Sequence, residues 1–365
     1  MSHESERTPG HVASDASAFY AIVAEHLVAS ERLAICTILR LTGSGPRRAG
    51  AKMFVRESEG SVGTVGGGVL EVKASAWAQE VLRTGLALCR PFALDLQQAS
   101  DEGMTCGGEV EVLVECLDGR TPAVRDFFAQ VLTVLTRAER GLLVTSITPS
   151  GNAVETEHFL VTGGRTLVSS PLSGLALPED LLRGPVAAAP GLVGRGAMRY
   201  FLEPLAPPIT VCVFGAGHIA SHLVPLCHSL GFRTVVVDDR ADFASRDRFP
   251  QAGDLVVVPS FGHALERLPL SEDSYVVIVT RGHAGDEAIL RQALRRGPGY
   301  IGMIGSQRKR TLIFEQLARE GFTAEDLARV SCPIGLPIGA ETPEEIAVSI
   351  AAQLIAARAG HRGKG

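Results

Sequence analysis

The stretch that decides the fold of this chain is Thr210-Val211-Cys212-Val213-Phe214-Gly215-Ala216-Gly217-His218-Ile219-Ala220. A short apolar run, typical of a buried strand, leads into a G-x-G-x-x-A turn, and a helical pattern follows the turn. The next apolar run ends in Asp238, 23 positions after Gly215. A strand, a glycine turn, a helix and a second strand ending in a carboxylate are typical of the Rossmann fold, which binds dinucleotides.

Each residue of this pattern has a physical role in holding a dinucleotide. Gly215 permits the tight turn, and Gly217 lets the backbone approach the pyrophosphate. His218 lies in the turn, where we expect it to contact a phosphate, and Asp238 is expected to accept hydrogen bonds from ribose hydroxyls. An acidic residue there disfavours a 2′-phosphate, so NAD is expected in preference to NADP, although such a fold can hold another ligand or none.

Downstream of this motif, short apolar strands alternate with helical stretches. The strands are expected at residues 255–258, 275–279 and 300–303, which predicts a doubly wound parallel sheet. His283 and Asp286 follow the strand at 275–279, at the end of the sheet where such folds bind ligands. They are candidates for an acid–base pair; the alternative is that Asp286 caps a helix at the surface.

The first half of the chain carries three glycine-rich loops, at residues 43–53, 63–71 and 104–108. They separate apolar strands and helices, which predicts a mixed α/β domain. Glycine allows positive φ angles and lets a ligand approach the main chain closely. The three loops therefore predict a binding surface.

The loops also supply groups that suit an anionic ligand with a thiophilic centre. Gly66, Gly67 and Gly68 directly precede a predicted helix, whose free N–H groups favour an anion. The first loop adds the cations of Arg47, Arg48 and Lys52, which would otherwise be ordinary solvated charges. In the third loop Cys106, beside Gly107 and Gly108, is predicted to be an accessible thiol; the alternative is a turn cysteine without chemistry.

These patterns divide the chain into five parts. We expect a flexible tail at 1–14, the α/β domain at 15–170, an interdomain connection rich in Pro, Gly and Ala at 171–207, the Rossmann-like domain at 208–358 and a second tail at 359–365.

Composition excludes several classes of protein. A formal net charge of −5 and an aromatic content of 5% argue against nucleic-acid binding. No apolar run approaches the ~20 residues of a membrane span, and the polar N-terminus lacks the pattern of a secretory signal. The seven cysteines are scattered, without a C-x-x-C pair, which is typical of a cytoplasmic protein without disulfides or a zinc site.

In their order along the chain, these motifs resemble the xanthine dehydrogenase accessory proteins of the XdhC/CoxI type. The resemblance runs from about Ala34 to Ala357. Its carriers are GSGPR at 43–47, GTVGGGVLE at 63–71, MTCGG at 104–108, FGAGH at 214–218, VDDR at 237–240, TRGH at 280–283, YIGMIGS at 300–306 and PIGLPIGAETPEEIA at 333–347. Gly45 and Gln307 depart from the residues common in the family, and Gln307 removes one potential anion contact.

The resemblance implies a carrier of molybdenum cofactor rather than an enzyme that turns over a substrate. Such a carrier holds the cofactor while a cysteine desulfurase installs a sulfido ligand, and then inserts it into a molybdenum hydroxylase of the xanthine dehydrogenase type. In that role, Arg47 and residues 66–68 would contact the phosphate, and Cys106 would contact molybdenum. A homodimer is compatible with the resemblance.

Two other functions compete with this one. The first is an NAD-dependent oxidoreductase that binds the dinucleotide through Gly215, Gly217 and Asp238 and uses His283 as its acid–base group. The second is a nucleotide-binding regulatory scaffold without catalysis.

Overall fold

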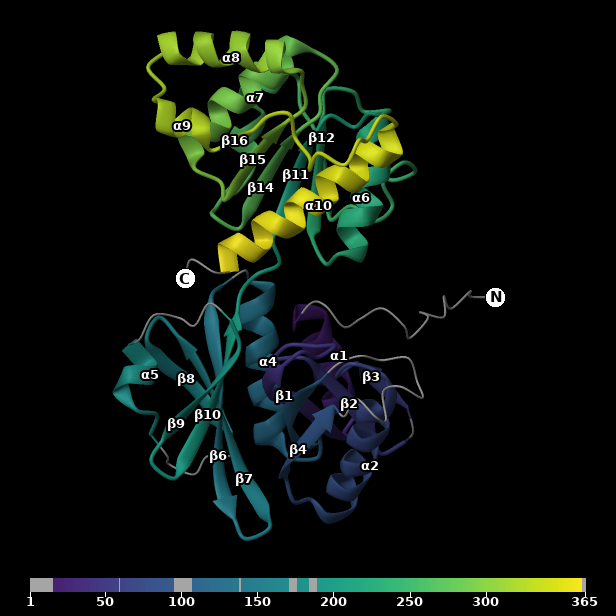
Figure 1. Cartoon of the computed structure of the whole chain (residues 1–365), viewed down its shortest axis with the longest axis vertical. Helices are drawn as coiled ribbons and strands as arrows, with labels where there is room; N and C mark the ends of the chain where they lie inside the picture. The colour runs from purple at the N-terminus through teal and green to yellow at the C-terminus, as the bar shows by residue number, and fades with distance from the viewer. Residues whose placement is uncertain are drawn as a thin grey trace. The chain divides into compact units, whose positions relative to one another are not determined.

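The computed structural model describes residues 16–58, 60–94, 107–137, 139–170, 176–183 and 189–362. The chain divides between Pro207 and Pro208 into two compact units (Figure 1). Both mix helices with sheets, so the predicted α/β class is confirmed.

The first unit opens with an antiparallel sheet of strand order β3-β2-β1-β5-β4. Its strands are β1 (Arg32–Gly43), β2 (Lys52–Arg56), β3 (Ser61–Gly63), β4 (Leu88–Leu94) and β5 (Gly108–Asp118), and its helices are α1 (Ala16–Val28), α2 (Gly68–Thr84) and α4 (Pro122–Thr136). Alternate residues of β1 are buried on opposite faces. Ala34 and Cys36 pack against α2, whereas Leu33 and Ile35 pack against α1 and α4.

A second antiparallel sheet, of order β8-β7-β6-β10-β9, completes the first unit. Its elements are β6 (Gly141–Ser150), β7 (Ala153–Thr162), β8 (Arg165–Ser170), α5 (Glu179–Arg183), β9 (Gly191–Arg195) and β10 (Met198–Leu205). Leu143 and Leu160 of this sheet join the core formed by α1 and α4, so both sheets share one apolar centre.

The sequence predicts an interdomain connection at residues 171–207. The second half of this prediction is wrong, because these residues form the strands β9 and β10. Strand β10 is hard to recognise in the sequence, because the charged residue Glu203 occupies a buried position where an apolar residue would be expected. Glu203 is tolerated there because Lys52 Nζ lies 2.7 Å from its carboxylate and the Tyr20 hydroxyl donates to it at 2.8 Å. A buried charge with such partners interrupts the alternation of apolar and polar residues in the sequence, but the strand still forms.

The second unit is a six-stranded parallel sheet of order β13-β12-β11-β14-β15-β16, which confirms the predicted Rossmann-like architecture. Its strands are β11 (Thr210–Phe214), β12 (Arg233–Asp238), β13 (Asp254–Val257), β14 (Ser274–Ile278), β15 (Tyr300–Met303) and β16 (Val330–Ser331). Its helices are α6 (His218–Ser229), η1 (Phe261–Arg267), α7 (His283–Arg296), α8 (Gln307–Arg319), α9 (Ala324–Ala328) and α10 (Pro343–Arg362). Helices α6 and α10 lie side by side on one face, and η1, α7 and α8 cover the other (Figure 1).

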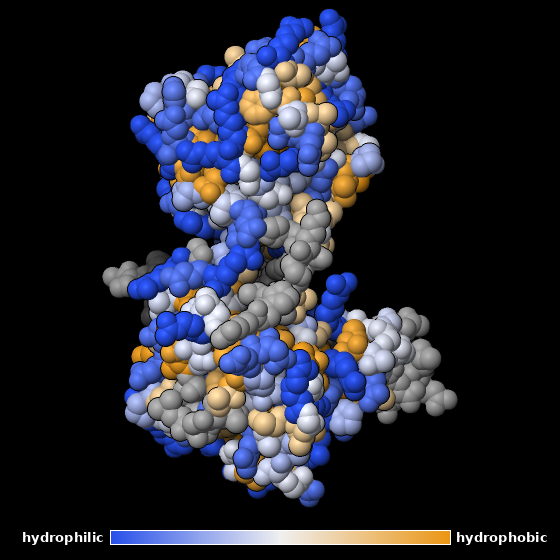
Figure 2. All heavy atoms as spheres, turned by 90° about the vertical axis from the view of Figure 1, so that its left-hand side faces the viewer, coloured by the Kyte–Doolittle hydropathy of each residue, from blue (hydrophilic) through white to orange (hydrophobic). Residues whose placement is uncertain are grey.

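The described helices and one face of the surface can be compared with what a membrane span requires. None of the described helices combines the length and the apolarity that a bilayer span needs. On the face drawn in Figure 2, hydrophilic residues are interspersed with smaller apolar patches.

The order of the parallel strands reverses between β11 and β14, so the loops after these strands lie at the switch point, where a fold of this kind has its ligand crevice. Gly215 allows this close approach. It has a φ of 105°, and a Cβ added to it would lie 2.5 Å from the carbonyl oxygen of Val279. The glycine that the motif places there is therefore required by the packing of two strands, whatever ligand is bound.

Gly215→Ala is expected to lower the stability of the second unit by about 1–3 kcal/mol, because it combines a strained φ with a backbone clash. Gly217→Ala is the matched control, since its φ is −83° and an added Cβ meets no atom within 4 Å. Thermal unfolding of both variants checks this expectation. Equal midpoints for the two variants would contradict it.

Candidate functional site

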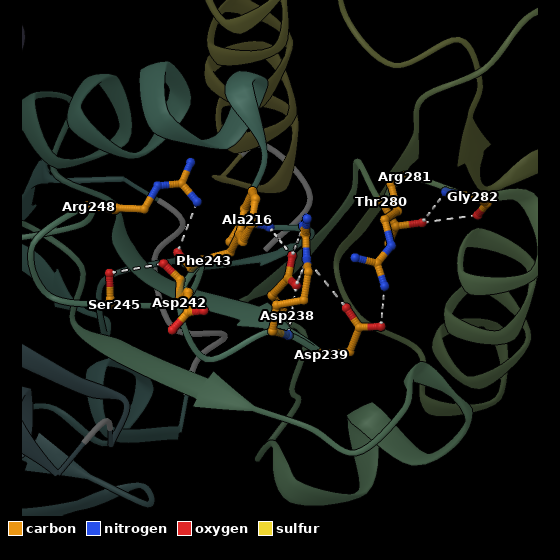
Figure 3. A network of polar contacts seen from close by, with 11 residues as sticks. Ala216, Asp238, Asp239, Asp242, Phe243, Ser245, Arg248, Thr280, Arg281 and Gly282 are labelled. Carbon is orange, nitrogen blue, oxygen red and sulfur yellow. Dashed lines mark hydrogen bonds and ion pairs between the residues drawn. The ribbon is translucent and has the colours of Figure 1, made fainter.

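The first candidate site is the crevice at the carboxyl ends of β11, β12 and β14 (Figure 3). Asp238, the last residue of β12, is buried, with 1% of its surface exposed. Its Oδ2 accepts hydrogen bonds from the Ala216 N–H at 2.7 Å and from Arg240 Nη2 at 3.0 Å. Its Oδ1 accepts from the Arg240 N–H at 3.0 Å and from Arg240 Nε at 2.8 Å.

These four hydrogen bonds change the expected role of Asp238. A carboxylate has about four lone-pair positions, so none is left for ribose hydroxyls while Arg240 stays in place. Burial by itself would raise the pKa of Asp238, but hydrogen bonds from Arg240 and Ala216 outweigh it and lower the pKa to about 2. Asp238 therefore braces the glycine turn against the end of β12, and its predicted contact with a nucleotide gains no support from this geometry.

Arg240 is the residue of this crevice that the sequence reasoning missed. Its guanidinium pairs with Asp238 and stacks on the ring of Phe243, with 3.5 Å between Cζ and the ring centroid. A second ion pair joins the loops after β12 and β14, the strands on either side of β11, since Arg281 Nη2 lies 2.8 Å from Asp239 Oδ2 (Figure 3). The signal in the sequence was the arginine that follows the two aspartates directly, but nothing local showed which carboxylate it would face.

His283 and Asp286 lie near each other in sequence but differ in their surroundings. His283 is exposed at the first turn of α7, whereas Asp286 is completely buried. Asp286 accepts a hydrogen bond from the Thr280 hydroxyl at 2.6 Å and forms an ion pair with Lys309 of α8. Within the described residues no hydrogen bond joins His283 to Asp286. Asp286 therefore links the loop after β14 to α8 through buried polar contacts. The alternative prediction, that Asp286 caps a helix at the surface, is wrong because Asp286 is buried.

The remaining predicted residues of this crevice lie at its edge. His218 is exposed at the start of α6, and Gly217 precedes it as the N-cap in an extended conformation. Among the described residues, no side-chain hydrogen bond caps the N-terminus of α6 at Gly217. Their contact with a phosphate stays a prediction.

The second candidate site lies in the first unit, where the glycine loops meet. Gly43 pairs with Gly108 at the end of β1 and β5, and a Cβ added to Gly43 would lie 2.8 Å from the carbonyl oxygen of Gly107. A Cβ added to Gly66 would lie 2.5 Å from Pro46 Cγ. The first loop thus lies directly against both of the others. We call this juxtaposition, formed by residues 43–46, 66–68 and 107–108, the glycine edge.

Cys106 lies outside the described residues, and its role stays a prediction. The other cysteines are poor candidates for a reactive thiol, because they are buried or half-buried. Burial raises the pKa of Cys36, Cys212 and Cys227 to about 12 and that of Cys89 to about 11. Gly107, the residue after Cys106, is exposed at the glycine edge.

The start of α2 is already occupied by a carboxylate of the chain. The Gly67 N–H donates to Glu71 Oε1 at 2.9 Å, and the Gly66 N–H donates to Thr64 Oγ1 at 3.1 Å. The Thr64 hydroxyl donates in turn to Glu71. A phosphate at residues 66–68 would meet this negative charge at the helix N-terminus. The assignment of Gly66, Gly67 and Gly68 to the cofactor stays a prediction, and this geometry weakens it.

The three cations predicted for the first loop separate in the structure. Arg47 and Arg48 are exposed, whereas the Lys52 side chain is 10% exposed and pairs with Glu203. The reason is the pleat of β2, which turns Lys52 to the same core face as Phe54. Lys52 is therefore not part of a surface for ligands.

Comparisons with known proteins agree with this architecture. The model of the XdhC and CoxI family matches residues 26–90, and the model of the XdhC Rossmann domain matches residues 211–354. A crystal structure described as a xanthine dehydrogenase from Bacillus halodurans has a TM-score of 0.75 and 25% identity, covering 93% of this chain and 96% of that one.

Two curated relatives align along most of their length. A protein of Bacillus subtilis, named as a probable subunit of xanthine dehydrogenase, is 26% identical over 354 residues, which is 93% of this chain and 97% of that protein. The molybdenum cofactor insertion chaperone PaoD from Escherichia coli is 21% identical over 337 residues, or 92% and 86%. An uncharacterized Escherichia coli protein, YqeB, is 32% identical over 160 residues, which is 44% of this chain but 29% of that protein.

Asp238→Asn is expected to lower the free energy of unfolding by about 2–3 kcal/mol near neutral pH, because the depressed pKa of Asp238 is a gain in stability. A carboxyl with a lowered pKa contributes fully above its unfolded value, near 3.8, and loses this contribution as the pH falls toward about 2. The difference between wild type and variant should therefore shrink over that range in urea unfolding. A difference independent of pH would contradict the assignment.

Arg240→Ala is expected to strengthen NAD binding to the crevice by about tenfold, because it frees acceptor positions on Asp238 for ribose hydroxyls. The wild type should bind NAD weakly. Arg281→Ala is the control, since Arg281 pairs with Asp239 and its loss leaves Asp238 saturated. Calorimetric titration with NAD checks both variants, and tight binding by the wild type would overturn this account of Asp238.

Proposed function

We propose that this protein binds molybdenum cofactor and inserts it into a molybdenum hydroxylase of the xanthine dehydrogenase type. The premise is that the chain belongs to the XdhC and CoxI family. The observation that carries the proposal is the glycine edge, at which three loops far apart in sequence meet. The name of the relative PaoD, a molybdenum cofactor insertion chaperone, supports the same role.

The chemistry of the first unit fits such a cargo. Glycine backbone without side chains admits a planar pterin close to the main chain. Arg47, exposed beside the glycine edge, supplies a cation for a phosphate. Molybdenum favours soft ligands, so the Cys106 thiolate would be its transient contact while the cofactor is held.

Holding the cofactor in this way gives a cysteine desulfurase time to install the sulfido ligand before transfer to the hydroxylase. The carrier itself then needs no group that turns over a substrate. The competing function, an NAD-dependent oxidoreductase, would require Asp238 to bind ribose, and the four hydrogen bonds on Asp238 speak against it.

Wild-type protein incubated anaerobically with molybdenum cofactor is expected to retain close to one molybdenum and one pterin per chain. Cys106→Ala should lower the retained molybdenum by about tenfold, because the soft ligand is lost. Cys89→Ala is the control, since this half-buried thiol has a pKa of about 11 and should not bind metal. Metal and pterin analysis after gel filtration measures both.

Activation of a cofactor-free xanthine dehydrogenase-type hydroxylase by the loaded protein provides the second readout. Failure of the wild type to retain any cofactor would overturn the proposal. Equal retention and equal activation by Cys106→Ala would keep the carrier and remove Cys106 from its site.

A further inference from the structure

The first unit contains a groove, and among the described residues that line it Arg48 is the one predicted site residue. Its volume is about 280 Å³. It is lined by Leu39, Arg40, Leu41, Arg48, Ala49, Gly191 and Leu192. Leu39, Ala49 and Leu192 also belong to one small apolar cluster, whereas Arg40 and Arg48 are exposed. The groove thus combines an apolar floor with two cationic side chains.

Local irregularity of the backbone creates this groove. The register between β1 and β5 shifts between Ile38 and Arg40, which marks a bulge. Ile38 is then held to the first loop by backbone hydrogen bonds, since its N–H donates to Ala51 O at 2.9 Å and its carbonyl accepts from the Gly50 N–H at 2.8 Å. The opposite side of the loop contacts the segment before β9, where a Cβ added to Gly50 would lie 2.6 Å from Pro190 Cγ. The bulge, these hydrogen bonds and the close approach of Gly50 to Pro190 therefore define the shape of the groove.

The arginines at the groove form no ion pair within the described residues, although Arg40 lies opposite Glu111 of β5, whose carboxylate pairs with Arg199. Arg40, Arg47 and Arg48 have no ion-pair partner there, although other arginines of the same unit do: Arg32 pairs with Glu57, and Arg199 pairs with Glu111. Three such cations lie within nine positions of a chain whose net charge is −5. Arginine binds phosphate through two parallel hydrogen bonds, so the groove favours a ligand with a phosphate group.

The alternative position for a phosphate, at the start of α2, is less suitable. Glu71 accepts the hydrogen bond of the Gly67 N–H there and contributes a negative charge. A phosphate placed in the groove instead meets arginines and no carboxylate among the lining residues. The electrostatic difference between the two places decides in favour of the groove.

We propose that this groove binds the phosphate end of molybdenum cofactor, with Arg40 and Arg48 as its contacts. This inference rests on the proposed function. Gly43, at the glycine edge, lies three residues beyond Arg40 on β1, or ~10 Å along the strand. A phosphorylated pterin held at Arg40 can therefore extend along β1 to Gly107, the neighbour of Cys106 in sequence.

Gly191→Leu tests the groove by filling it. A Cβ added to Gly191 meets no atom within 4 Å among the described residues, and its φ lies outside the left-handed region, so the leucine fits without strain. Gly194→Leu is the matched control on the same strand, because it is equally open but does not line the groove. The probe is molybdenum cofactor released anaerobically from a purified hydroxylase, titrated by its pterin fluorescence.

Gly191→Leu and the double variant Arg40→Ala/Arg48→Ala are each expected to raise the Kd for the cofactor by about tenfold or more, and Gly194→Leu should change it by less than about twofold. Arg48→Lys should fall between, since it keeps the charge but loses the two-pronged contact. If Gly191→Leu fails to fold, as judged by thermal unfolding, the arginine variant decides.

The outcomes distinguish a wrong groove assignment from a wrong carrier function. Tight binding by the wild type that is unchanged in both Gly191→Leu and the arginine double variant would overturn the groove and leave the carrier function standing. No binding by the wild type would overturn the carrier function, and the groove assignment with it.

Discussion

The pairing of β1 with β5 is the constraint on which the first unit depends. It runs from Arg32 opposite Asp118 to Gly43 opposite Gly108, and β1 is buried on both faces for most of its length. Apolar burial on two faces fixes which residues can lie at the end of the strand, because a slip by one position would exchange the faces. The position of the glycine edge follows from this register.

The same strand also gives the unit its open groove. The bulge after Ile38 leaves Leu39 in the core and Arg40 exposed. A regular strand would continue the alternation without such a break. One continuous element therefore connects an apolar core, a cationic groove and the glycine edge.

In the second unit, paired charges dominate the place where a Rossmann fold binds its nucleotide. Asp238 pairs with Arg240, Asp239 with Arg281 and Asp286 with Lys309. Each of these carboxylates thus has a cation within the protein, and at Asp238 the acceptors that a ribose would need are used internally. The fold is that of a dinucleotide-binding domain, but function depends on the site and not on the fold.

The amino-acid sequence by itself determined the fold class, the glycine turn after β11 and the family, because these depend on local apolar periodicity and on residue types at fixed spacings. It also indicated the three glycine loops, although only the pairing of β1 with β5 and the close approach of Gly66 to Pro46 show that they meet. The tertiary structure alone decided the partners of Asp238, the burial of Lys52 against Glu203 and the strands β9 and β10. The physical reason is the same in each case. Hydrogen bonds and ion pairs form between side chains that the chain brings together from separate strands and loops, and a polar residue whose partner comes from elsewhere in the fold cannot be distinguished in the sequence from one exposed to water.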